Sequence, residues 1–163
     1  MTVWRTTREA EHAAYDLVSA LGEPVLQLAT HFAAGAVVVT AETSDGVTIL
    51  ASDGLPPEVA SEAGRLVELH ENRCGGRLFA FGGADVLTGV VEVGDILART
   101  DIDEVVMVGH REPLPPEARL DSQAFVRPTM AGGRIELVVR PAAGGVVVPF
   151  EQPNPTPCCA DHA

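Results

Sequence analysis

The chain has 163 residues, which is the length of one ordinary domain. Its hydrophobic fraction of 46% is enough for a folded core and excludes wholesale disorder. The formal net charge of -12 repels phosphate backbones and anionic lipid headgroups, so we expect no binding to nucleic acid or to membrane surfaces.

All 11 basic side chains are Arg, so the chain has no Lys for a Schiff base or a P-loop. The first residues contain no apolar run of the kind that marks a signal peptide, and no stretch is long enough to span a bilayer. We therefore expect a cytoplasmic protein. Three Cys side chains in a reducing compartment favour metal or redox chemistry over a disulfide framework.

The first third of the chain predicts a helix followed by a hairpin. Thr6 and Glu9 have the spacing of a capping box, and apolar residues then recur at helical spacing, so we expect a helix over 6–21. Residues 25–30 fit either a strand or a helical turn, which would leave His31 as a structural loop residue. Two β-branched runs, 36–42 and 47–52, flank an Asp-Gly turn and predict a β-hairpin.

The rest of the chain predicts a second long helix and a series of strands. Prolines at 56 and 57 suit a first helical turn, and the apolar spacing after them predicts a helix over 56–72. A short helical turn is expected at 95–99. The expected strands cover 77–81, 86–93, 104–109, 124–127, 134–140 and 145–150, with a hairpin between the last two.

These elements predict an α+β protein with a mixed, mostly antiparallel sheet and two main helices. We expect one domain over 1–151. Prolines at every second position predict an extended tail over 152–163.

The opening of the chain resembles a GAF domain. The similar residues are Ala36-Val-Val-Val-Thr-Ala-Glu, Asp45-Gly46, Val47-Thr-Ile-Leu-Ala-Ser and Gly54-Leu-Pro-Pro-Glu, which cover about a third of the chain. The resemblance implies a regulatory domain that binds a small ligand. The second half of the GAF pattern is missing here, so no ligand residues are carried over.

The C-terminal tail has the densest chemistry in the sequence. Cys158, Cys159 and His162 place two thiols and an imidazole within five residues. Thiolate and imidazole are the preferred ligands of zinc and of other soft or borderline divalent metals. Cys74 and His70, four residues apart in the body, are the candidates to complete the metal site.

We therefore expect a non-catalytic metal-binding accessory or assembly protein. Its tail would bind zinc or a similar metal, or dock on a metalloenzyme as its protein partner. The sequence is also compatible with a homo-oligomer. Two alternatives remain: a GAF-like small-ligand sensor, and a thiol-dependent enzyme with Cys74 as nucleophile. A thiol at a helix C-terminus is held less readily as thiolate, which counts against the enzyme.

Overall fold

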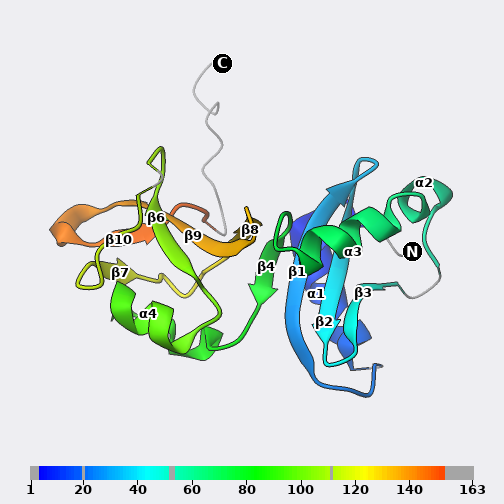
Figure 1. The fold of residues 1–163 in the computed structure, drawn as a ribbon, viewed down its shortest axis with the longest axis horizontal. Helices are drawn as coiled ribbons and strands as arrows, with labels where there is room; N and C mark the ends of the chain where they lie inside the picture. Colours follow the sequence, from blue (N-terminus) through cyan, green and yellow to red (C-terminus); the bar gives the residue numbers. More distant parts are fainter. Residues whose placement is uncertain (1–3, 20, 52–53, 111, 153–163) are drawn as a thin grey trace, which may run out of the picture.

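The computed structural model describes residues 4–19, 21–51, 54–110 and 112–152. Within this part of the chain the structure has two lobes that lie side by side and meet at strands β4 and β8 (Figure 1).

The first lobe is a strand meander with a helix on each face. Its elements are α1 (Thr7–Val18), β1 (Val25–Ala33), β2 (Ala36–Thr43), β3 (Gly46–Leu50), α2 (Pro57–Ala60) and α3 (Ala63–Glu71). Successive β2 residues point to opposite faces of the sheet. Val37 and Val39 pack with Ala10 of α1, whereas Val38 packs with Leu66 of α3. The first lobe is therefore a sheet between two helical layers.

The second lobe consists of one longer strand, β9, several short strands and one α-helix. After β4 (Arg77–Ala80) come a 3-10 turn (Ala84–Val86), β5 (Val90–Glu92), α4 (Val93–Arg99), β6 (Glu104–Met107), β7 (Arg119–Asp121), β8 (Thr129–Ala131), β9 (Arg134–Pro141), a 3-10 turn (Ala143–Gly145) and β10 (Val147–Pro149). Ile96 of α4 packs into the core of this lobe with Leu120 and Leu137.

One sheet runs through both lobes. The strand order is β3-β2-β1-β4-β8-β9-β10-β7-β5, and β6 pairs with β9. Most neighbours are antiparallel, but β6–β9 and β7–β10 are parallel. Strand β4 pairs with β8 only at Arg77 and Thr129, so the sheet is narrow where the lobes meet. Strands β7 and β10 are likewise joined at one residue pair. The predicted α+β class with a mixed, mostly antiparallel sheet is confirmed.

Several predicted elements are confirmed in place. The capping box at Thr6 and Glu9 is formed, and α1 starts directly after it. The hairpin around Asp45 and Gly46 is formed by β2 and β3. Strands β4, β6 and β9 match their predicted ranges closely, and β9 and β10 form the expected second hairpin.

The predicted helix over 56–72 is wrong as a single element, because it is divided into α2 and α3. The Ser61 hydroxyl donates to the Glu58 carbonyl at 2.8 Å, a local bond that competes with continued helix formation. Residues 86–93 form a strand only at β5, since Gly89 has a φ of 66°.

The predicted strand over 124–127 is also wrong. Gln123 and Ala124 have φ values of 51° and 53°, which are left-handed and incompatible with a strand. His31, expected in a loop, lies within β1. No helix among the described residues is long and apolar enough to cross a bilayer.

Candidate functional site

A buried chain of polar side chains joins β1, β2 and α3. The Thr40 hydroxyl oxygen lies 2.8 Å from Nε2 of His31 and 2.6 Å from Nδ1 of His70. Thr40 has no exposed surface, and the exposed fractions of His31 and His70 are 4% and 1%. A hydroxyl donates one hydrogen bond and accepts others, so Thr40 connects both rings when each carries a single proton.

Burial decides the charge of both rings. Desolvation lowers the pKa of His31 from 6.5 to about 4, with smaller contributions from the nearby His70 and Arg65. Desolvation, followed by the charge of Arg73, likewise lowers the pKa of His70 to about 4. Both imidazoles are therefore neutral at neutral pH. The hydrogen bonds among His31, Thr40 and His70 stabilise the packing of α3 on the sheet without a buried charge.

The outer nitrogen of His70 points toward Glu42. Its Nε2 is buried without a hydrogen-bond partner and lies 3.6 Å from Glu42 Oε2. The carboxylate favours a proton on this nitrogen, so the Thr40 hydroxyl donates to Nδ1 of His70. Thr40 is too deeply buried to attack a substrate. We therefore assign the hydrogen-bonded group of His31, Thr40 and His70 a structural role.

His31 forms part of the floor of a surface hollow of about 320 Å³, which we call the second hollow. It is lined by Thr30, His31, Phe32, Arg65, Leu66, Leu69, Gly76, Arg77, Thr129 and Glu151. Gly76 has a φ of 109°, and a Cβ placed on it would lie 2.6 Å from Cε1 of His31. Only glycine fits at this position without displacing the imidazole.

A larger hollow of about 520 Å³, the first hollow, lies between α1 and the second lobe. It is lined by Thr7, Arg8, Glu11, His12, Tyr15, Arg77, Phe125, Arg127, Glu151 and Gln152. This volume is within the range of small-molecule sites. Arg77 and Glu151 line both hollows, so one ion pair separates the two.

Two arginines and two glutamates form a network in the wall of the first hollow. Arg127 donates to both oxygens of Glu11, from Nη2 at 2.9 Å and from Nε at 3.3 Å. Arg77 donates to Glu151 at 2.6 Å, and its contact with Glu11 is longer, at 3.5 Å. Glu11 is 16% exposed and Glu151 is 36% exposed. Glu11 is thus held in place from two sides, whereas Glu151 has a single partner and more contact with solvent.

Aromatic rings border the same wall. The guanidinium of Arg127 lies over the Phe125 ring, 4.5 Å from its centroid, in a cation–π contact. Tyr15 is 54% exposed and packs edge-on against Phe79. The first hollow therefore offers fixed guanidinium groups next to aromatic surface.

The structure does not test the sequence-predicted metal site. Cys158, Cys159 and His162 lie outside the described residues. Helix α3 ends at Glu71, so Cys74 comes after the helix; its thiol is exposed and donates to the Asn72 carbonyl at 3.2 Å. Across the described ranges, no three His, Cys, Asp or Glu side chains are arranged to hold a metal ion.

Sequence reasoning missed the first hollow because its members are far apart in the chain. Glu11 and Arg127 are separated by 116 positions and approach only through the fold. A local signal existed at Glu11, an acidic residue on a helix face with apolar neighbours, but nothing in the sequence pairs it with Arg77 or Arg127.

Comparisons of the chain with protein-family models, curated proteins and solved structures found no match. The resemblance to GAF domains therefore depends on the residues of the first third alone.

Proposed function

We propose that this chain is a non-catalytic binding protein that holds a small organic anion in the first hollow. The observation that supports this proposal is the gathering of Arg8, Arg77 and Arg127 around one small-molecule-sized hollow in a strongly acidic chain. Three of the 11 arginines line it, against two glutamates. The proposal belongs to the same class as the small-ligand sensor that the GAF resemblance implies.

The charge balance of the first hollow favours an anion. Glu11 and Glu151 balance the charges of Arg77 and Arg127. Arg8 is exposed and has no ion pair within the described part of the chain, so its positive charge is in excess. Guanidinium groups bind carboxylates and phosphates through paired, charge-assisted hydrogen bonds. Phe125 and Tyr15 add surface for the apolar part of an organic anion.

An NMR titration with benzoate and with inorganic phosphate tests this function. We expect the Nε–Hε signals of Arg77 and Arg127 to shift on addition of an anion, with millimolar affinity. Arg77→Gln and Arg8→Gln should each weaken binding about tenfold, since each removes a charge-assisted contact. Arg8 belongs to no ion pair in the described residues, so its variant keeps the network intact.

Arg119→Gln is the matched control, because Arg119 is an exposed arginine on β7 outside the first hollow. It removes the same charge and should leave the affinity unchanged. If neither anion shifts these signals, or if Arg119→Gln weakens binding as much as Arg8→Gln, the proposal is wrong.

The metal-binding arm is a second proposal. Glu151 lines the second hollow together with Gly76, which lies two residues after the exposed Cys74. The seven residues from Gln152 to Cys158 make six Cα–Cα steps, which span about 20 Å when extended, and this length supports a reach from the second hollow to Cys74. Of the two body candidates, this exposure favours Cys74 over the buried His70.

Elemental analysis of the purified full chain tests the arm. We expect about one equivalent of zinc in the wild type, and none in a variant that combines Cys158→Ser with Cys159→Ser. Cys74→Ser should lower zinc affinity about 10-fold or more if this thiol completes the site, which is about the effect of losing a metal-supporting group. Affinity should also fall in acid, because thiols lose protons on binding. Equal metal content in wild type and double variant would remove this proposal.

A further inference from the structure

We propose that Glu151 is a built-in competitor for the anion site, so that a carboxylate ligand binds Arg77 by displacing it and frees the segment that leads into the C-terminal arm. This inference rests on the proposed function of the first hollow. It adds the chemical class of the ligand and a consequence of binding.

The contacts of the two glutamates differ in a way that singles out Glu151. Glu11 accepts three hydrogen bonds from Arg77 and Arg127, and α1 holds it in place. Glu151 has one contact, from Nη1 of Arg77 at 2.6 Å, and it is the most exposed member of the network. Glu151 is the least buried carboxylate of the network and has the fewest contacts, so the contact between Arg77 and Glu151 is the one that a ligand can replace.

The exchange leaves the net charge of the network unchanged, so its electrostatic free-energy cost is small. Arg77, Arg127, Glu11 and Glu151 together carry no net charge. A ligand carboxylate that takes the place of the Glu151 carboxylate keeps the same balance and the same kind of hydrogen bond. No unpaired charge is left in the half-buried wall, which would otherwise be the main cost of the exchange.

The backbone around Glu151 can move with such an exchange. The last backbone anchor before it is the Phe150 N–H, which donates to the Val138 carbonyl at 2.9 Å. Strand β10 ends at Pro149, so Glu151 lies beyond the sheet, and its side chain is tethered to Arg77. Displacing the carboxylate therefore removes the side-chain tether at Glu151, directly before the predicted arm over 152–163.

Affinity measurements on Glu151→Gln test the inference, with benzoate as the carboxylate probe. We expect benzoate to bind Glu151→Gln about fivefold more tightly than it binds wild type. In wild type the Glu151 carboxylate competes with benzoate for Arg77, and an ion pair of this kind weakens binding by about this factor. In wild type, benzoate should shift the backbone amide signals of Glu151 and Gln152 along with those of Arg77.

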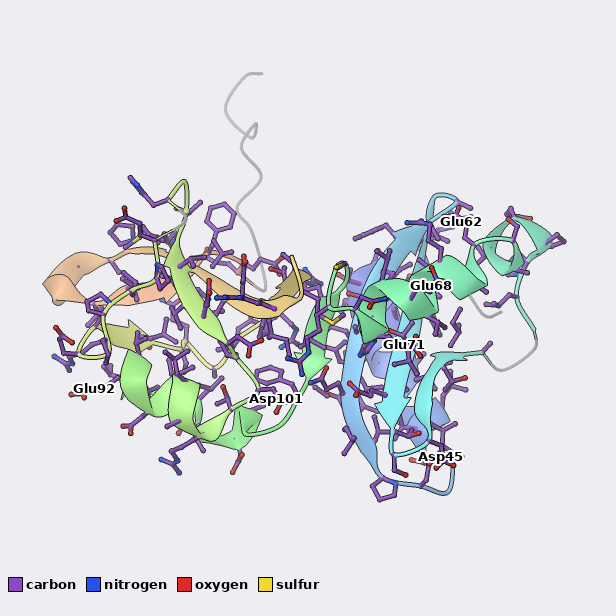
Figure 2. All side chains as sticks on the ribbon, in the orientation of Figure 1. Asp45, Glu62, Glu68, Glu71, Glu92 and Asp101 are labelled. Carbon is purple, nitrogen blue, oxygen red and sulfur yellow. The ribbon has the colours of Figure 1, made fainter. Side chains whose placement is uncertain are left out.

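Glu92→Gln is the matched control. It removes one negative charge from an exposed side chain on the side of the second lobe away from the junction (Figure 2). A similar gain in both variants would show a general charge effect and overturn the inference. An equal gain, about fivefold, for phosphate as well as benzoate would overturn the assignment to carboxylates.

The two proposals fail in different ways. If no anion binds to wild type or to Glu151→Gln, the proposed function fails. If benzoate binds to wild type through Arg77 and Arg8 but no more tightly to Glu151→Gln, the function stands and the competitor role of Glu151 is wrong.

Discussion

The free energy of unfolding is expected to fall steeply as the pH is lowered from about 6.5 to about 4. Burial lowers the pKa of both His31 and His70 from 6.5 to about 4 in the folded protein. Between these two pH values both histidines are protonated in the unfolded protein but remain neutral in the folded protein. Their contribution to the free energy of unfolding is therefore fully present above pH 6.5 and is lost as the pH falls toward 4. Each imidazole contributes about 3 kcal/mol to this loss.

Urea denaturation at a series of pH values measures this effect. The combined loss from the two imidazoles, about 6 kcal/mol, is a large part of the roughly 5–15 kcal/mol that is typical of a domain. His70→Gln removes one of the two titrating groups and keeps an amide that can bond Thr40, so it should show about half of the pH dependence. A wild-type stability that stays constant from about pH 7 to about pH 4.5 would contradict the buried, neutral state of both rings.

Gly76→Ala is expected to destabilise the protein by about 2–5 kcal/mol, by combining backbone strain with overpacking. The φ of Gly76 is 109°, a conformation that L residues rarely adopt. The new methyl would also lie 2.6 Å from Cε1 of His31 and 2.9 Å from Cε of Met130. The Met130 side chain can move, but His31 is fixed by its hydrogen bond to Thr40.

Gly46→Ala separates the two contributions. Gly46 has a φ of 126°, but a Cβ added to it would meet no atom within 4 Å outside its immediate chain neighbours, so this variant carries strain without a clash. Thermal and urea unfolding should show a clearly smaller loss for Gly46→Ala than for Gly76→Ala. Equal losses would show that the close approach to His31 contributes nothing.

The sequence predicted best those elements whose causes lie within a few residues. The capping box at Thr6 and Glu9 and the Asp-Gly turn of the β2–β3 hairpin are local signals, and both are formed. At the division of α2 from α3 the Ser61 hydroxyl bonds the Glu58 carbonyl, a local competitor of the helix that apolar spacing does not reveal. The missed strands β7 and β8 have only three residues each and take their strand form from their neighbours in the sheet.

The candidate site was less predictable than the fold. His70 was singled out as a metal ligand, but its partnership with Thr40 and His31 comes from the packing of α3 on the sheet. Arg77 and Arg127 occur in the sequence as isolated basic residues without a motif. Their meeting with Glu11 requires the second lobe to return to α1, which no local pattern encodes.

The narrow point in the sheet has a mechanical consequence. Between β4 and β8 the backbone is joined at one residue pair, and polar bridges such as Gln27–Asp101 and Glu11–Arg127 supply further links between the lobes. Asp101 lies at this junction in Figure 2. Ionic links weaken as salt screens them, whereas apolar cores do not. Because Ala29 of β1 belongs to the buried apolar cluster of the second lobe, added electrolyte should weaken only the ionic part of this junction and leave its apolar part in place.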